Sequence, residues 1–252
     1  MAFNLLPDPW IPVHLPGGET RWVAPAEIVD LGDVDCDIEW GRPEFRVASL
    51  ELLIGIFAVA FSDHLTDSGD WAALLDEPPS RAEIERRLVP LEPYFVLDGI
   101  GPRFLQDIEP IEGEIRRPDA LLIDAPGENT LKNGADIFSK RDRFAVLSRR
   151  AAALALYAMQ AFAPSGGAGH RTSMRGGGPL TNFVVPERPT LWRRIAANLP
   201  LLSDYDKRLP GAADWGTVFP WALQTRLSTD GLKTERGSQA HYLQCYFGMP
   251  RR

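Results

Sequence analysis

A glycine-rich stretch with basic side chains, GGAGHRTSMRGGGP at residues 166–179, contains the residue types best suited to bind a phosphate or a nucleic acid. Its fourteen positions hold six glycines, two arginines and one histidine. Because glycine has no Cβ, its backbone can approach a flat or grooved ligand closely and can adopt a positive φ without strain. Arg171 and Arg175 could contact phosphates, and His170 adds a hydrogen-bond donor beside them. This stretch is therefore the first candidate for a binding site.

The order of elements around this stretch argues against a nucleotide-binding P-loop. A P-loop leaves a strand and enters a helix, so that the helix N-terminus and the backbone N–H groups point at the phosphate. Here a predicted helix precedes the glycines, a predicted strand follows them, and no GK[ST] is present. Backbone N–H and C=O groups would instead suit the minor groove of duplex DNA, where shape matters more than sequence. The alternative is that the glycines only form tight turns, which is the interpretation we favour for Gly176–Gly178, next to Pro179.

No other group of residues makes a convincing catalytic or metal centre. His170 lies near Ser173, but no GxSxG nucleophile motif is present. The four histidines lack metal-ligand spacing with one another and with the two cysteines. Four acidic residues at alternate positions could hold a cation, although we favour the interpretation that they form a solvated acidic edge of a strand. They are Asp33, Asp35, Asp37 and Glu39. We therefore expect a binding protein that is not an enzyme and needs no cofactor or metal.

The charge of the chain is divided unevenly along the sequence. The formal net charge is −7. Residues 1–130 carry 9 basic and 26 acidic side chains, residues 131–200 carry 11 and 3, and residues 201–252 carry 7 and 5. The middle segment, which contains the glycine-rich stretch, is thus positive within an acidic chain. Such a local positive field would attract a polyanion at one place only, although solvated helix faces are an equal alternative.

Length and composition indicate an ordinary globular protein. The 252 residues are 44% hydrophobic and 24% charged. The longest apolar run, residues 52–61, is about half of the ~20 residues that a helix needs to cross a bilayer. The N-terminal residues lack a basic segment and contain three prolines, so we expect no signal peptide, no membrane span and a cytoplasmic location. For Cys36 and Cys245 a disulfide is possible, but two buried thiols are favoured.

Helices are predicted wherever a capping residue precedes an apolar pattern. The first runs from Ser49 to about Phe61, and the second starts at Ser80 and continues through Leu88. A longer helix starts after Ser148 and ends before Pro164, with a buried stripe at three- and four-residue spacing. The stripe consists of Ala151, Leu154, Ala158 and Ala161. A final helix follows Thr190.

Strands are predicted in five short stretches. Residues 8–13 and 21–25 should form a hairpin, with Trp10 and Trp22 as its buried aromatics. Residues 93–107 read as two strands around a turn at 99–102, LTNFVV as a strand ending at Pro186, and HYLQCYF as a last strand. The polar residues 126–145 are expected to form a long surface loop. The fold class is therefore α+β, an irregular, loop-rich domain of several helices and short sheets.

Four stretches of the sequence resemble the CasA family, the large subunit of the type I-E CRISPR surveillance complex Cascade. They are APSGGAGHRTSMRGGGPLTNFVV at 163–185, NLLPDPWIPV at 4–13, PRFLQD at 102–107 and YFGMPRR at 246–252. They occur in the family's order, and the resemblance covers the whole chain. It implies that residues 1–252 are the family's N-terminal α/β domain, and that the family's C-terminal helical bundle is absent from this chain. Because YFGMPRR stops within a strand-like pattern, we expect a fragment.

The resemblance implies recognition of DNA within a ribonucleoprotein. In RNA-guided effectors the guide RNA pairs with the target strand, and the protein reads a short adjacent motif, the PAM, on double-stranded DNA. The family's glycine loop probes the PAM from the minor groove. The matching residues are Gly166, Gly167, Ala168, Gly169 and His170, with Arg171 and Arg175 as phosphate contacts. Alanine at the third position departs from an all-glycine run.

The resemblance also implies a docking loop and a set of partners. A mobile loop at about 126–145 would contact the guide RNA and neighbouring Cascade subunits. The matching residues are Asn129, Lys132, Asn133, Lys140 and Arg141. The implied function is PAM recognition, the start of R-loop formation, and recruitment of a helicase-nuclease. Two alternatives stay open: an assembly scaffold that grips RNA and subunits without reading a PAM, and a stand-alone small-molecule enzyme.

Overall fold

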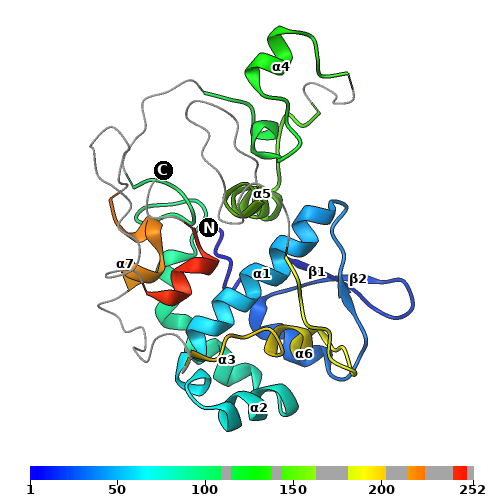
Figure 1. Cartoon of the computed structure of the whole chain (residues 1–252), viewed down its shortest axis with the longest axis vertical. Helices are drawn as coiled ribbons and strands as arrows, with labels where there is room; N and C mark the ends of the chain where they lie inside the picture. The colour runs from blue at the N-terminus through cyan, green and yellow to red at the C-terminus, as the bar shows by residue number, and fades with distance from the viewer. Residues whose placement is uncertain (109–114, 138–142, 163–180, 203–214, 225–240, 249–252) are drawn as a thin grey trace. The chain divides into compact units, whose positions relative to one another are not determined.

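A computed structural model describes six ranges of the chain (Figure 1). These are residues 1–108, 115–137, 143–162, 181–202, 215–224 and 241–248. The chain divides into two compact units, the first made of Met1–Glu109 with Asn182–Arg252 and the second of Pro110–Thr181. Each unit is described below by itself. The predicted α+β class is confirmed, because the described residues contain helices and one small three-stranded sheet.

The sheet of the first unit is built on the predicted hairpin. Strands β1 (Ile11–His14) and β2 (Thr20–Val23) pair antiparallel, and β3 (Asp37–Ile38) pairs antiparallel with the other edge of β1. Gly17 and Gly18 form the turn with φ values of 107° and 89°, which favour glycine. The hairpin prediction is therefore confirmed.

The two hairpin tryptophans differ in burial, contrary to the prediction that both are buried. Trp10 is fully buried, and its Nε1–H donates to the carbonyl of Leu5 at 2.6 Å. Trp22 is 39% exposed, because alternate residues of a strand face opposite sides and its neighbour Val23 takes the inner side. The Trp22 ring instead packs edge-to-face on Trp40, with ring centroids 5.5 Å apart.

Helix α1 (Pro43–Ala60) crosses the centre of the first unit and begins earlier than predicted. Pro43 occupies its first turn, where the missing N–H costs nothing. Ser49 is therefore not its N-cap. The Ser49 hydroxyl is buried inside the helix, donates to the Phe45 carbonyl at 2.7 Å and accepts the Nε1–H of Trp40 at 2.9 Å. The predicted end of the helix near Phe61 is confirmed.

Helices α2 (Ser68–Asp76), α3 (Arg81–Leu88) and α6 (Leu191–Ala196) begin at side-chain caps. The hydroxyls of Ser80 and Thr190 each accept a backbone N–H three residues on, at 3.2 Å, as predicted. The indole of Trp192 donates to the Leu74 carbonyl at 2.8 Å and so joins α6 to α2.

Short helices complete the first unit. They are the 3-10 helices η1 (Pro25–Leu31), η2 (Ser62–Leu65), η3 (Val89–Tyr94), η6 (Pro220–Ala222) and η8 (Tyr242–Tyr246), and the one-turn α7 (Trp215–Val218). The predicted last strand is thus wrong. His241 caps η8, because its Nδ1 accepts the N–H of Leu243 at 3.1 Å, and η8 packs against α1.

Aromatic rings from distant parts of the sequence form the second centre of the core. Phe95, Phe104, Phe219, Trp221 and Phe247 are all buried, and their ring centroids lie 5.0–6.1 Å apart where they meet. Edge-to-face and stacked contacts of this kind add to the free energy gained by burial.

The predicted strand pair in residues 93–107 is reduced to a single bridge. Val96 pairs with Asn4 there, and no strand forms at this place. The turn is confirmed: Gly99 and Gly101 have φ values of 148° and 97°. Leu105 also has a positive φ, 55°, which is uncommon for a residue with a branched side chain.

Residues 181–185 form no strand, so the strand predicted there is wrong. The side-chain amide of Asn198 binds the backbone of Val184 instead. Its Oδ1 accepts the N–H of Val184 at 2.8 Å, and its Nδ2 donates to the Val184 carbonyl at 2.9 Å.

The described part of the second unit is helical. It contains η4 (Pro118–Leu121), α4 (Glu128–Lys132) and α5 (Arg149–Phe162). The Ser148 hydroxyl accepts the N–H of Ala151 at 3.2 Å, so the predicted cap of α5 is confirmed. Three positions of the predicted stripe are buried, and Ala151 is only half-buried. The α4 helix lies inside the stretch that was predicted to be a loop.

Candidate nucleic-acid interface

The residues of the predicted glycine loop lie outside the described part of the chain. This applies to Gly166, Gly167, Ala168, Gly169, His170, Arg171 and Arg175. The described chain leaves this region at Phe162, the last residue of α5, and resumes at Thr181. Helix α5 is anchored by the buried side chains of Leu154, Tyr157 and Phe162. The helix predicted before the glycines is therefore confirmed, whereas no strand forms at the described residues 181–185 after them.

Helix α4 carries three of the predicted docking residues. Asn129, Lys132 and Asn133 are exposed and follow at i, i+3 and i+4, which places them on one side of a helix. The N–H of Asn133 donates to the Asn129 carbonyl at 3.1 Å, and Gly134 ends the turn with a φ of 61°. Lys140 and Arg141 lie outside the described residues. The structure thus brings together three of the five predicted docking residues.

The charges around α4 leave Lys132 as an exposed cation. Arg143 pairs with Asp124 at 3.1 Å, and Arg117 lies 3.6 Å from Asp119. Lys132 makes no ion pair within the part of the chain that the structure describes. By sequence, Pro110–Thr181 carries 10 basic and 7 acidic residues, net +3, and the rest of the chain carries 17 and 27, net −10. The second unit is therefore positive and the first is acidic.

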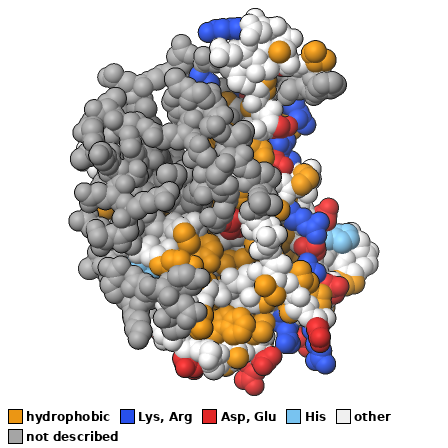
Figure 2. Space-filling model, in the orientation of Figure 1, with side chains coloured by type: hydrophobic (Ala, Val, Ile, Leu, Met, Phe, Trp, Pro, Cys, Tyr) orange, Lys and Arg blue, Asp and Glu red, His pale blue; other side chains and the backbone are white. Residues whose placement is uncertain are grey.

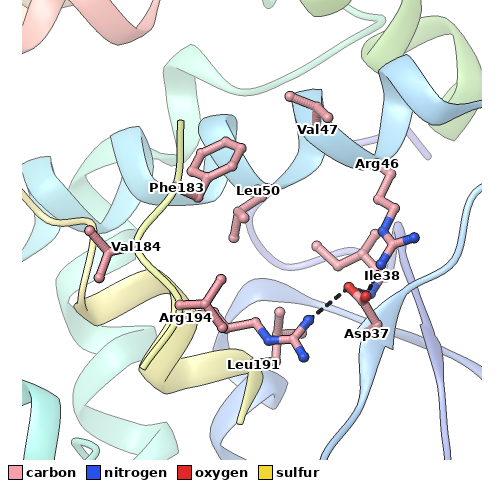
Figure 3. Close-up of a pocket in the computed structure, with 10 residues that line it drawn as sticks. Asp37, Ile38, Arg46, Val47, Leu50, Phe183, Val184, Leu191 and Arg194 are labelled. Carbon is pink, nitrogen blue, oxygen red and sulfur yellow. Dashed lines mark hydrogen bonds and ion pairs between the residues drawn. The ribbon is translucent and has the colours of Figure 1, made fainter. Parts of the chain in front are cut away.

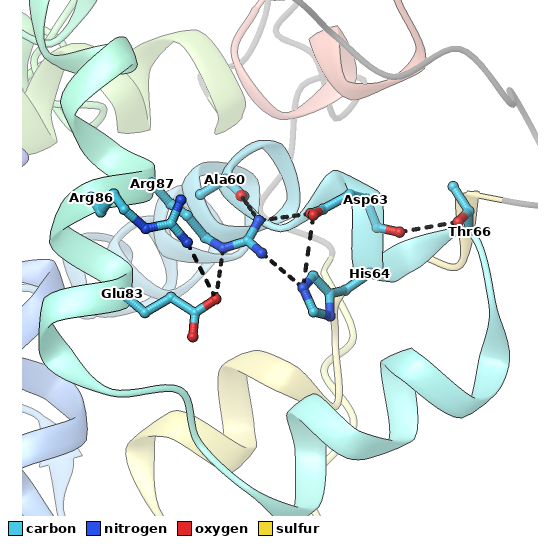
Figure 4. Close-up of polar contacts among 7 residues, drawn as sticks. All are labelled: Ala60, Asp63, His64, Thr66, Glu83, Arg86 and Arg87. Carbon is cyan, nitrogen blue, oxygen red and sulfur yellow. Dashed lines mark hydrogen bonds and ion pairs between the residues drawn. The ribbon is translucent and has the colours of Figure 1, made fainter.

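The densest polar cluster of the first unit surrounds Arg87 of α3 (Figure 4). Its guanidinium donates to the Ala60 carbonyl at 3.1 Å, to Asp63 at 2.7 Å and to Glu83 at 3.1 Å. A fourth contact, 2.8 Å long, joins it to Nε2 of His64. Arg87 donates at every contact, so Nε2 of His64 accepts there. The guanidinium carbon also lies 4.6 Å from the centre of the Phe61 ring.

The electrostatics of this cluster indicate a structural clamp. Burial alone would raise the pKa of Asp63, but the hydrogen bond and charge of Arg87 outweigh it and lower that pKa below its usual value. Burial would lower the pKa of Arg87, but its bonds to Asp63 and Glu83 raise it. Both groups therefore stay charged near neutral pH. The cluster joins α3 to the end of α1 and to η2.

The other two histidines within the described residues lie far from this cluster in the fold. His14 is exposed on β1, and His241 is buried as the cap of η8. Among the residues described, no group of histidine, cysteine or acidic side chains is arranged to hold a metal ion.

The predicted acidic edge is ion-paired in part. Arg194 of α6 lies 3.1 Å from both Asp35 and Asp37, and Arg46 of α1 also pairs with Asp37. These contacts join α6 to β3 and to the loop before it, and join α1 to β3 (Figure 3). The acidic alternation thus has a structural use at two of its four positions.

The cysteines do not form a disulfide. Cys36 is buried, as predicted, and burial raises the pKa of its thiol, against a smaller opposing effect of the hydrogen bond with the Leu191 backbone. Cys245 is exposed, so the prediction that both are buried is wrong for this residue.

The sequence pattern does not reveal most of the arginines that join distant elements through ion pairs. Arg87 follows Glu83 by four residues, and this spacing alone could have predicted that ion pair. The other partners of Arg87 are more than twenty residues away. Arg194 pairs with Asp35 from 159 residues away, and no local pattern predicts that.

Solved structures of CRISPR-associated proteins have the same fold. The chain is similar to the Thermus thermophilus CasA (Cse1) structure, with a TM-score of 0.66 and 20% identity over 98% of this chain and 48% of that one. Cse1 from Acidimicrobium ferrooxidans gives a TM-score of 0.61 and 21% identity over 90% of this chain and 44% of that one. A structure titled CRISPR RNA-guided surveillance complex gives a TM-score of 0.54 and 17% identity over 79% of this chain and 44% of that one. The fold is therefore that of the Cse1 N-terminal part.

The sequence also matches a family directly. The chain belongs to the family of the CRISPR-associated protein Cse1 (CRISPR_cse1), which it matches over residues 4–252. The resemblance to the CasA family is thereby confirmed. The chain spans less than half the length of the three solved structures given above. No curated protein matches it, and no helix among the described residues is long and apolar enough to cross a membrane.

Proposed function

We propose that this chain is the DNA-recognition part of a Cascade large subunit. It recognises the PAM of target double-stranded DNA, helps start R-loop formation and offers a surface to the recruited helicase-nuclease in the cytoplasm. The observation that carries the proposal is membership of the Cse1 family over residues 4–252. The similar fold of a chain from an RNA-guided surveillance complex supports the same assignment.

Recognition of the PAM is assigned to the glycine loop. The backbones of Gly166, Gly167, Ala168 and Gly169 would approach the minor groove, with His170 as an added donor. A bare backbone suits this groove, because its donor and acceptor pattern is degenerate and a side chain has little to read there. The flanking arginines, at 171 and 175, would contact phosphates and add the salt-dependent part of the affinity.

Docking onto the guide RNA and neighbouring subunits is assigned to α4 and the residues after it. The exposed side chains of Asn129, Lys132 and Asn133 offer donors and one positive charge on one side of the helix. The net charge of +3 for the second unit, against −10 for the rest, favours contact with a polyanion through this unit.

A binding role is also favoured over chemistry. In the described residues the best-connected polar cluster, around Arg87, is used to join α1 to α3. We propose that the chain works without a catalytic centre, cofactor or metal of its own.

The PAM assignment is tested in reconstituted Cascade with the Gly167→Asp variant. An aspartate at this position would place a negative side chain against the phosphates that border the groove. We expect at least about a tenfold loss of affinity for a PAM-bearing duplex, equivalent to ~1.4 kcal/mol, with unchanged assembly of the complex. Gly41→Asp is the matched control, because Gly41 is exposed and a Cβ there meets nothing within 4 Å. Unchanged affinity of the Gly167 variant at physiological salt would contradict the assignment.

The exposed face of α4 also favours a second candidate, an assembly scaffold that binds RNA and subunits without reading a PAM. Lys132→Glu should then weaken incorporation of the subunit into the complex, measured by size-exclusion chromatography. Affinities for duplexes with and without a PAM, compared across salt concentrations, separate the two functions. A scaffold gives a salt-dependent affinity with no PAM preference, and a PAM reader gives both.

A further inference from the structure

A small groove in the first unit is lined by η1, α3, η3 and the N-terminal turn, and contains no residue assigned to DNA or RNA above. Its volume is about 230 Å³. The buried residues of its lining are all apolar: Leu6, Ala24, Ala26 and Leu88. Pro7 and Val89 border the groove on the surface, and Val89 is 57% exposed. The groove therefore offers an apolar surface that a ligand can reach.

The charged part of the lining is mainly acidic. It consists of three carboxylates and one guanidinium, those of Glu27, Glu85, Glu92 and Arg81. Arg81 lies 2.7 Å from Glu85 and 3.4 Å from Glu27. It also pairs with Asp30, outside the lining, at 3.1 Å. One guanidinium is thus shared by three carboxylates, and the lining keeps an excess of two negative charges.

Glu92 is held at the groove by its backbone, because its carbonyl accepts an N–H of the Asn4 side chain at 3.0 Å. Its carboxylate makes no ion pair within the part of the chain that the structure describes. The other cations of α3, Arg86 and Arg87, both pair with Glu83. Figure 2 shows acidic and basic side chains interspersed over the described part of the visible face. Glu92 differs, since its negative charge is left for a partner to neutralise.

Carboxylates beside an apolar floor suit a long basic side chain. Such a side chain lays its aliphatic stem on apolar surface and keeps its charged end near water. The negative lining repels phosphates, which excludes a nucleic acid as the occupant. Among the residues described, no group of acidic side chains is arranged to hold a metal ion. The volume is also below that of usual pockets for drug-sized ligands, ~300–1,000 Å³.

We propose that this groove binds one lysine side chain of a partner protein, together with an apolar residue beside that lysine. The ammonium group would bind Glu92 and Glu85, and the stem would cover Leu88. A protein is favoured over a free amine, because a free amine would leave the exposed rim of Pro7 and Val89 uncovered. The net charge of −10 outside residues 110–181 attracts a basic partner surface. This site does not depend on the function proposed above.

The proposal is tested on the whole chain with the peptide Ac-Ser-Val-Lys-Val-Ser-NH2 as a probe. Methyl NMR shifts are followed during titration, together with the affinity. We expect saturable shifts at Leu6, Leu88 and Val89. A peptide with norleucine in place of lysine keeps the aliphatic stem but not the charge, and should bind at least about five times more weakly. The free amine n-butylammonium lacks the apolar neighbours and should bind at least about ten times more weakly.

Matched variants separate the charge from the apolar floor. Glu92→Gln should weaken the lysine peptide about fivefold and leave the norleucine peptide unchanged. Glu19→Gln, in the exposed turn between β1 and β2, is the control and should change neither affinity. The proposal is overturned by equal binding of the lysine and norleucine peptides, or by the absence of shifts at the groove residues at millimolar peptide. Binding of n-butylammonium as tight as that of the peptide, or displacement of the peptide by an oligonucleotide, would also overturn it.

Discussion

Replacing Gly55 by alanine should destabilise the first unit, although the same change stabilises most helices. Gly55 lies in the middle of α1, where the chain packs against the 3-10 helix η8. A Cβ at this position would lie 2.7 Å from the Cβ of Tyr246 and 3.1 Å from a ring carbon of Phe247. Carbon atoms in favourable contact lie about 3.5–4.0 Å apart. The Cβ of Tyr246 is fixed to the backbone, so relief requires movement of η8 itself.

Two opposing effects determine the size of this change. Alanine gains about 1 kcal/mol over glycine in a helix interior. An extra methyl group in a well-packed core costs about 1–3 kcal/mol. Because the overlap at Gly55 is close to 1 Å and involves a fixed atom, we expect the upper part of that range and a net loss of about 1–2 kcal/mol. Gly55→Val, which adds two further carbons, should lose more.

Urea unfolding followed by tryptophan fluorescence and circular dichroism measures this difference. The midpoint should fall while the slope of the transition stays the same. Gly41→Ala is the control, because a Cβ there meets nothing within 4 Å, and it should change the free energy of unfolding by less than about 0.5 kcal/mol. A Gly55→Ala protein as stable as the unmodified chain would refute the close packing of η8 on α1.

Three further predictions concern polar groups of the first unit. Arg87→Lys keeps the charge but cannot reach all four partners of the guanidinium, and should lower the free energy of unfolding by about 1–2 kcal/mol; no loss in urea unfolding would contradict the clamp. Asp63 has a lowered pKa in the folded state, so its stabilising effect is present above the unfolded pKa of about 3.9 and is lost as the pH falls through the folded value. Asp63→Asn should therefore be less stable than the unmodified chain at pH 7, with the difference shrinking below about pH 4; a constant difference would count against the pairing with Arg87. Ser49→Ala leaves the indole N–H of Trp40 without its acceptor and should cost about 1–2 kcal/mol in the same assay; a change under about 0.5 kcal/mol would show that the bond is dispensable.

Local signals predicted the helices better than the strands. Ser80, Ser148 and Thr190 were each recognised as caps, because a hydroxyl that accepts an N–H three residues later depends only on adjacent sequence. The prediction that Ser49 caps a helix was wrong, because its role depends on a residue outside the local helix pattern. Its hydroxyl forms the bonds of a buried serine within a helix, and only the position of Trp40 reveals this.

Strands were harder to predict, because each strand pairs with residues that its own local sequence does not identify. The hairpin of β1 and β2 was predictable because a short turn brings its own partner alongside. Residues 181–185 were also predicted to be a strand, yet they form none, and the backbone of Val184 is bonded to the side chain of Asn198. The last predicted strand is a 3-10 helix that fills space beside α1.

The candidate interface divides in the same way. The glycine loop, its flanking arginines and the basic middle segment are visible in the sequence, because they are defined by residue type and spacing. The common face of Asn129, Lys132 and Asn133 required α4, since a loop would not have aligned them. A small pocket lined by Val184 could not be predicted, because its other walls come from α1, β3 and α6.

The sequence alone determined the family, the α+β class, the charge division and most helix starts of this protein. Each of these depends on composition or on residues within a few positions of one another. The tertiary structure decided which aromatic rings are buried, which acidic groups pair with arginine and which predicted strands do not form. The physical reason is that burial and pairing depend on neighbours far away in the chain, as Arg194 demonstrates, because it pairs with Asp35 from 159 residues away.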